Sequence, residues 1–585
     1  MKKPTAIWAL AATLAIAAPV LAEDQGIQPE SGTGLEDKTQ TGARREMVVA
    51  ANPHAARAGA RILEQGGSAV DAVIAMQLVL NLVEPQSSGI GGGAFLLHFD
   101  AASGMVRSYD GRETAPAAAT GDLFIGPDGG TPGYLEAVIG GRSVGVPGLL
   151  RMLEAAHQAH GALPWDALFK PAIWLSETGF EISPRLNGLV GRVPTLARIG
   201  DTASYFMTPD GAPKAVGTVL RNPDFAATLR AIAAGGGDAF YGGEIAKDIV
   251  ATVQDSPLHP GLLTLDDMAR YDAKLRAPVC LGYRGNRVCG MGPPSSGGIT
   301  ILQILGLLSH FDMASLEPNS LDAVHLFAEA SRLAYADRDH YLADADFVSV
   351  PVNGLLDPAY LSNRAALIDP ARAAARAAVG SPPGAEQARW ISTGSPELPA
   401  TSHLSVVDRH GNAVAMTTSI EFAFGSALMV RGFLLNNQLT DFSFRSRRDG
   451  HLVANRVQAG KRPRSSMAPT IVLDPTGRLR LVIGSPGGSR IICYVASALI
   501  GVIDWGLDPQ AAVSLPHRCN RGGATDIEKG TALEGLASAL EARGHEVKIR
   551  DMNSGLHAIV ATPGDGDALY QGGADPRREG LAIGR

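Results

Sequence analysis

The spacing of apolar and polar residues predicts alternating strands and helices. Met47–Ala51 is a short apolar run that is typical of a buried strand. One helix is predicted over His54–Glu64 and a second over Ala69–Val83. The second helix has clear limits, because Ser68 can cap its first turn and Pro85 cannot continue it.

The middle of the chain is predicted to be mainly helical. A Gly-rich run at residues 89–94 leads into a predicted strand at Phe95–Phe99. Residues 150–350 then alternate helical runs with short loops. Within them, Asp322–Asp339 predicts an amphipathic helix.

The pattern changes at residues 376–400, which are rich in Ala, Gly, Pro and Ser and predict an exposed linker. Directly after this linker, residues 401–408 and 413–420 predict two strands joined by a tight turn. Residues 491–503 predict a helix. The C-terminal third is therefore predicted to be a β-rich block with a helical layer.

The first 22 residues predict a cleaved signal peptide. Lys2 and Lys3 precede an apolar stretch that ends at Leu21, and the small Ala22 suits signal peptidase. The alternative is a membrane anchor, but the stretch is short for a span, which needs about 20 apolar residues. We therefore expect a periplasmic or secreted protein without stable membrane insertion.

Composition excludes several classes of protein. The chain has 585 residues, of which 45% are hydrophobic and 19% charged, so a disordered chain and a coiled coil are both excluded. The net charge of −7 argues against a protein that coats nucleic acid, which needs a basic surface.

The four cysteines indicate structural rather than metal chemistry. Cys280 and Cys289 flank a predicted hairpin, and an exported protein can join them as a cross-strand disulfide. The sequence has no C-x-x-C pair, so neither a zinc knuckle nor a thioredoxin-type redox site is supported.

Three motif matches fail on their context. The glycines at 89–94 fit a dinucleotide loop, but a helix precedes them and a strand follows, which reverses the required order. Residues 141–145 fit a nucleophile elbow, but no helix starts at the Ser. The aspartates between 337 and 346 lack the Gly and Glu of a Ca²⁺ loop. We predict no metal and no cofactor.

Thr401 is the residue with the most suggestive position. A Thr hydroxyl becomes a good nucleophile when the chain is cut before it, because the new α-amine can act as its base. The reference pKa of that amine, about 7.7–8.0, suits a proton acceptor near neutral pH. The linker ends at Ala400 and Thr401 opens a strand, as such a cut requires. From this layout alone, an ordinary Thr at the start of a strand is the better interpretation.

Further evidence comes from seven short motifs that follow one another between residue 43 and the C-terminus. They are SGIGGG at 88–93, RETAP at 112–116, PPSSGG at 293–298, TSHLSVVD at 401–408, LLNNQ at 434–438, RSSMAPT at 464–470 and GSPGGSR at 484–490. Together they resemble the motifs of the γ-glutamyltranspeptidases, also called glutathione hydrolases.

The resemblance implies a fold, a maturation and an activity. The fold is an α+β, four-layer αββα sandwich of the N-terminal-nucleophile hydrolases. A large subunit (23–400) and a small catalytic subunit (401–585) form it jointly, after the precursor cleaves itself at Ala400–Thr401. The implied enzyme is an exported hydrolase and transpeptidase of glutathione-like γ-glutamyl amides. It passes the γ-glutamyl group through an ester on Thr401 to water, an amino acid or a peptide.

The resemblance also implies the site residues, all by their place in the motifs. Thr401 is the nucleophile and the hydroxyl of Ser419 supports it. The remaining roles are an oxyanion hole at Gly487 and Gly488, a clamp for the substrate α-carboxylate at Arg112, Ser465 and Ser466, and a site for the α-ammonium at Gln438 and Asp441.

Two departures from the family affect the substrate. Glu421 stands where the family usually has Asn, and we expect it to join Asp441 beside the α-ammonium. The segment between Asp441 and Ser465 is short and contains no Tyr to cover the site. Two alternatives follow, a glutaryl or cephalosporin-type acylase and a non-catalytic secreted binding protein, both on the same fold.

Overall fold

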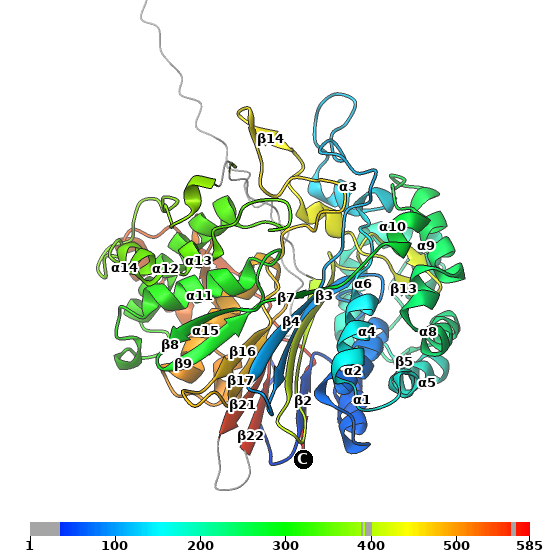
Figure 1. Ribbon diagram of the computed structural model, residues 1–585, viewed down its shortest axis with the longest axis horizontal. Helices are drawn as coiled ribbons and strands as arrows, with labels where there is room; N and C mark the ends of the chain where they lie inside the picture. Colours follow the sequence, from blue (N-terminus) through cyan, green and yellow to red (C-terminus); the bar gives the residue numbers. More distant parts are fainter. Residues whose placement is uncertain (1–34, 388–389, 392–399, 563–568) are drawn as a thin grey trace, which may run out of the picture.

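The computed structural model describes residues 35–387, 390–391, 400–562 and 569–585. Two seven-stranded sheets stack face to face, and helices cover the outer face of each sheet (Figure 1). The predicted four-layer α+β sandwich is thereby confirmed. The predicted signal peptide lies outside the described residues, and so do residues 388–389 and 392–399 of the predicted linker.

The sheet that carries Thr401 is antiparallel throughout. In spatial order its strands are β23 (Leu581–Gly584), β2 (Met47–Ala50), β10 (Ala400–Val407), β11 (Ala413–Glu421), β3 (Gly93–Asp100), β4 (Met105–Gly111) and β7 (Lys274–Arg276). β10, β11 and the edge strand β23 come from the chain from residue 400 onward, whereas β2, β3, β4 and β7 come from the chain before it. Neither part of the chain can therefore build this sheet alone.

The second sheet mixes the two parts of the chain in the same way. Its strands in spatial order are β1 (Thr41–Ala43), β22 (Leu569–Ala574), β21 (His557–Thr562), β17 (Leu479–Gly484), β16 (Thr470–Leu473), β9 (Asn286–Gly290) and β8 (Val279–Tyr283). Against it pack α11 (Gly297–Leu308), α12 (Leu321–Tyr341), α15 (Ile491–Ile503) and α16 (Pro509–Val513). The first sheet is covered by α1 (Pro53–Glu64), α2 (Ala69–Val83), α4 (Leu149–His160), α5 (Lys170–Thr178) and α8 (Pro223–Tyr241).

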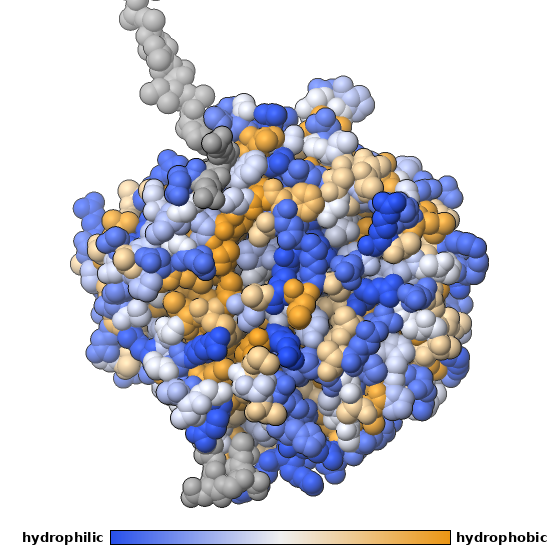
Figure 2. Space-filling model, viewed as in Figure 1, coloured by the Kyte–Doolittle hydropathy of each residue, from blue (hydrophilic) through white to orange (hydrophobic). Residues whose placement is uncertain are grey.

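Alternation along the strands builds two kinds of core. On β3, Leu96 packs against the helices while Leu97 packs between the sheets. On β11, Val414 packs against the helices and Ala415 packs between the sheets. Both faces of these strands are therefore buried, which fixes the register of the central strands firmly. On the face of the molecule that Figure 2 shows, hydrophobic residues are interspersed with hydrophilic ones.

Most predicted elements are confirmed, and one prediction about their character is wrong. Helix α2 has the predicted bounds, and Ser68 and Asp71 form a capping box at its start. Helix α12 covers the predicted 322–339 segment but is not amphipathic, since it is buried on almost every side. Its buried charges are neutralised inside the fold: Asp337, for example, pairs with Arg364.

The predicted Cys280–Cys289 disulfide is confirmed, and it joins directly opposed residues of β8 and β9. A second disulfide, Cys493–Cys519, ties α15 to β18 (Arg518–Asn520) and was not predicted. Within the described residues, no helix has both the length and the apolar character needed to cross a membrane.

Candidate active site

The start of β10 is distorted at the predicted cleavage point. Thr401 lies opposite Ser419 on β11, whereas Ala400 lies opposite Glu421, so Ile420 is an extra residue in the ladder. Such a β-bulge bends a strand and is common beside active sites. Here it falls on the Ala400–Thr401 peptide bond.

The bulge brings three groups of the proposed chemistry into one hydrogen-bonded line. The Oγ1 of Thr401 donates to the Oγ of Ser419 at 3.3 Å. The Oγ of Ser419 donates in turn to the carbonyl oxygen of Ala400 at 2.8 Å. The backbone N–H of Glu421 donates to the same Oγ at 2.8 Å and holds it in place. Ser419 therefore connects the hydroxyl of Thr401 with the carbonyl group that precedes it in the chain.

A narrow cavity of about 20 Å³, roughly the space of one water molecule, opens beside Thr401. The structure brings every predicted site residue except Gly487 to its wall. The lining is Arg112, Thr401, Ser419, Glu421, Gln438, Asp441, Ser465, Ser466, Met467, Gly488 and Ile491. Residues from both sides of position 400 therefore meet in one small space.

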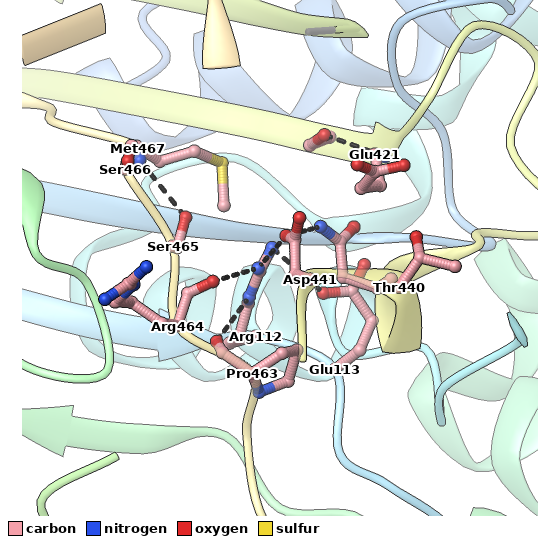
Figure 3. Close-up of polar contacts among 12 residues, drawn as sticks. Arg112, Glu113, Glu421, Thr440, Asp441, Pro463, Arg464, Ser465, Ser466 and Met467 are labelled. Atoms are coloured by element: carbon pink, nitrogen blue, oxygen red, sulfur yellow. Dashed lines mark hydrogen bonds and ion pairs between the residues drawn. The ribbon is translucent and has the colours of Figure 1, made fainter. Parts of the chain in front are cut away.

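Arg112 and Asp441 form a buried ion pair at one side of this cavity (Figure 3). The Nη2 of Arg112 lies 2.5 Å from the Oδ2 of Asp441, and the Arg112 side chain is 1% exposed. The carbonyl oxygens of Pro463 and Arg464 accept from the same guanidinium, and Gln438 donates to Asp441 at 2.8 Å. The two residues predicted to hold opposite ends of the substrate are thus in direct contact.

Glu421 is held in an unusual conformation. Its φ of +78° lies in the region that favours Gly and Asn, so its backbone is strained. The hydroxyl of Tyr134 donates to one carboxyl oxygen and the amide of Asn437 to the other. Burial, reinforced by the charge of Asp441, raises the pKa of Glu421 well above its usual value.

Sequence reasoning missed Tyr134, which lies in α3 (Tyr134–Val138), 287 residues before Glu421. Its ring is stacked on Phe444 at a centroid distance of 6.4 Å and lies edge-on to Phe422. A single Tyr at the start of a short helix carries no local signal of this contact. The segment between Asp441 and Ser465 contains no Tyr, and the Tyr that contacts Glu421 comes from a distant part of the chain.

The loop that carries Ser465 and Ser466 is fastened by the PPSSGG motif. Ser295 donates to the carbonyl oxygen of Met467 at 2.6 Å. Ser296 donates to that of Ser465 through both its hydroxyl and its backbone N–H, each at 2.7 Å. The two serines of the cavity wall are therefore positioned by backbone contacts across residue 400.

Gly487 and Gly488 connect β17 to α15. Both have positive φ, +135° and +58°, and a Cβ at Gly487 would lie 2.5 Å from the ring of Tyr494. Consecutive residues of this kind can turn backbone N–H groups toward one point, as an anion site requires. Gly488 lines the cavity, and Gly487 is its neighbour in the chain.

A larger cleft of about 580 Å³ lies elsewhere and contains none of the predicted site residues. The ends of α1 and α6 (Pro184–Arg192) line it, with Glu36, Glu181 and Glu579. It holds no nucleophile paired with a base, so the small cavity at Thr401 is the better candidate for chemistry.

The comparisons with known proteins show the family of the chain. The family model described as Gamma-glutamyltranspeptidase matches residues 55–585. A glutathione hydrolase proenzyme of Bacillus subtilis (strain 168) is 36% identical over 546 residues, which cover 92% of this chain and 91% of that protein.

The comparisons also include acylases. The Acylase ACY 1 proenzyme of Pseudomonas sp. (strain SE83) is likewise 36% identical, over 94% of this chain and 95% of that protein. The crystal structure of cephalosporin acylase from Bacillus halodurans matches with a TM-score of 0.80 and 28% identity, covering 96% of this chain and 99% of that one.

The buried Glu113 predicts a pH-dependent stability. Its carboxyl is unexposed, its nearest cation is Arg112 at 3.8 Å, and burial raises its pKa to about 8. An unfolded Glu loses its proton near pH 4.3. The folded state therefore binds the extra proton between these values, and stability falls as pH rises through the window. We expect Glu113→Gln to flatten the fall of the melting temperature between about pH 5 and pH 8.

The control for this experiment is Glu541→Gln, which removes an exposed carboxylate on α17 (Ala537–Ala542). Differential scanning fluorimetry of both variants and the parent protein at several pH values gives the comparison. A Glu113→Gln profile parallel to that of the parent would show that Glu113 titrates alike in both states.

Proposed function

Since the chain belongs to the gamma-glutamyltranspeptidase family, we propose that Thr401 cleaves the precursor at Ala400–Thr401 and then carries the γ-glutamyl group. The enzyme is a hydrolase and transpeptidase of the glutathione hydrolase type, made as a proenzyme. The observation that carries the proposed role of Thr401 is its hydrogen-bonded line through Ser419 to the Ala400 carbonyl.

Maturation begins with attack of the Thr401 hydroxyl on the preceding carbonyl carbon. The hydrogen bond from Ser419 to the Ala400 oxygen stabilises the negative charge that develops there. The Oγ1–C bond forms, the C–N bond breaks, and the released amine of Thr401 takes up the proton. Water then hydrolyses the ester, which leaves a large subunit (23–400) and a small subunit (401–585).

Turnover repeats this chemistry on the substrate. The free α-amine of Thr401, with a reference pKa of about 7.7–8.0, accepts the Oγ1 proton as the hydroxyl attacks the γ-amide carbonyl. The backbone at Gly487 and Gly488 receives the oxyanion, and the leaving amine departs with a proton. The ester is then transferred to water, an amino acid or a peptide.

The polar groups of the cavity wall suit a zwitterionic donor. Ser465 and Ser466 face the α-carboxylate together with Arg112, while Asp441 and Gln438 face the α-ammonium. The contact between Arg112 and Asp441 supports this arrangement, because a carboxylate and an ammonium can lie alongside the pair with charges alternating. Glu421 lies within the same wall and adds a second carboxyl near the ammonium.

The second candidate is an acylase, which the comparisons support at equal identity. A glutaryl group has the carboxylate but not the ammonium. It would leave Asp441 and Glu421 facing a methylene group, which is costly for polar groups that are already buried. We therefore favour the γ-glutamyl donor. Export through a signal peptide at 1–22 stays part of the proposal.

The maturation step predicts two chains in the purified protein, the smaller beginning at Thr401. Thr401→Ala should stay a single chain because the attacking hydroxyl is lost, and Ser419→Ala should slow cleavage at least about tenfold, the loss of one hydrogen bond to a developing charge. Gel electrophoresis and N-terminal sequencing measure both. The matched control is Thr418→Val, since the Thr418 hydroxyl has no hydrogen-bond partner among the described residues. Active enzyme with an intact Ala400–Thr401 bond would refute the mechanism.

The donor preference predicts that γ-glutamyl anilide turns over at least about 100-fold faster than glutaryl anilide, a difference of about 2.7 kcal/mol. Glu421→Asn should keep γ-glutamyl activity and narrow the difference in rate between the two anilides. It should also raise the melting temperature, because Asn tolerates a positive φ. The carboxyl must lose its proton to pair with the ammonium, and its pKa is raised by burial, so the preference for the γ-glutamyl donor should grow as the pH rises. Equal rates on the two anilides would favour the acylase.

A further inference from the structure

Arg338 links the large part of the chain to the predicted carboxylate clamp. It lies near the end of α12 with its side chain 3% exposed. Its Nη2 donates to the Oγ of Ser466 at 2.7 Å, and its Nε donates to the Oγ of Ser296 at 2.9 Å. The remaining nitrogen, Nη1, pairs with Asp339 at 2.6 Å. A buried guanidinium thus contacts one of the two serines assigned to the substrate.

The chemistry of the guanidinium constrains the Ser466 hydroxyl. An Arg side chain only donates hydrogen bonds, whereas a hydroxyl has one proton to donate and two lone pairs that accept. Because Ser466 accepts from Arg338, its own proton must point away from that group. The neighbouring Ser465 accepts from the backbone N–H of Met467 at 3.1 Å, which constrains it in the same way.

Both hydroxyls lie in the wall of the cavity beside Thr401. A hydroxyl that accepts from a cation is also a stronger donor, because the accepted hydrogen bond polarises it. A carboxylate in the cavity needs donors, and these two serines are held so that they can donate.

We propose that Arg338 is a positioning residue for the donor α-carboxylate, and that it acts by orienting the hydroxyl of Ser466. This inference rests on the proposed γ-glutamyl function. Under this proposal each subunit supplies two residues to the carboxylate site. Arg112 and Arg338 come from the large subunit, and Ser465 and Ser466 come from the small one. The site would then form only when the two subunits stay together.

The test compares a donor that has the α-carboxylate with one that lacks it. We expect Arg338→Gln to lower kcat/KM for γ-glutamyl anilide about 10-fold or more, chiefly through KM, the effect of losing a charge-assisted hydrogen bond. The matching donor is 4-aminobutyryl anilide, which carries the amine on the same carbon and has hydrogen in place of the carboxylate. Its kcat/KM should change less than threefold.

A double-mutant cycle separates orientation of Ser466 from general damage. If Arg338 acts through Ser466, then Arg338→Gln should cost little more once Ser466→Ala is present. Arg338→Lys, which restores one donor and the charge, should recover part of the loss. Additive losses in the double variant would overturn the proposal, and so would equal losses on both donors.

The matched control is Arg332→Gln on the same helix. Arg332 is equally buried and pairs with Glu329, but it does not line the cavity. Arg332→Gln should lower the melting temperature without changing the ratio of the kcat/KM values for the two donors. If Arg338→Gln fails to mature, the Lys variant carries the same comparison. A parent enzyme that turns over neither donor would instead refute the proposed function.

Discussion

The register between β10 and β11 is the constraint on which the site depends. Thr401 meets Ser419 at the last regular pair of the ladder, and the extra residue Ile420 then shifts Ala400 to a position opposite Glu421. A shift by one residue would turn every side chain of β10 to the opposite face. The strand is held against such a shift by pairing with β2 on its other edge and by burial of both faces. Arg578 adds a hydrogen bond of 3.1 Å to the carbonyl oxygen of Thr401.

The same register explains how the fold could tolerate the proposed cut, which lies at the start of β10. Cleavage before Thr401 removes only Ala400 from the ladder, because the pairing with β2 begins at Leu404 and that with β11 continues to Val407. Both sheets interleave strands from the two sides of the cut. The subunits therefore share both sheets and their hydrophobic cores, and separating them would expose those cores to water. The proposed cleavage before Thr401 is thus compatible with an intact fold.

Local signals were sufficient for the elements and insufficient for several contacts. Ser68 and Pro85 determined the bounds of α2 from the sequence alone, because caps and breakers act within a few residues. The family motifs led to the residues of the cavity wall. Tyr134 and Arg338 were missed, since each meets its partner across more than 100 residues and no local pattern marks the contact. The burial of α12 was missed because its charges are neutralised by partners from other segments.

Charge balance gives a physical reason to distinguish the two donor classes, which identity to relatives does not provide. In the cavity wall, Arg112 is matched by Asp441, and the raised pKa of Glu421 favours its neutral form. Behind the wall, Arg338 pairs with Asp339. A γ-glutamyl group brings one negative and one positive charge at its α-carbon, so the buried balance is preserved. A glutaryl group brings only the negative charge, and the protein would have to compensate it in a space that excludes water. The paired charges of the wall therefore favour a donor that is itself paired.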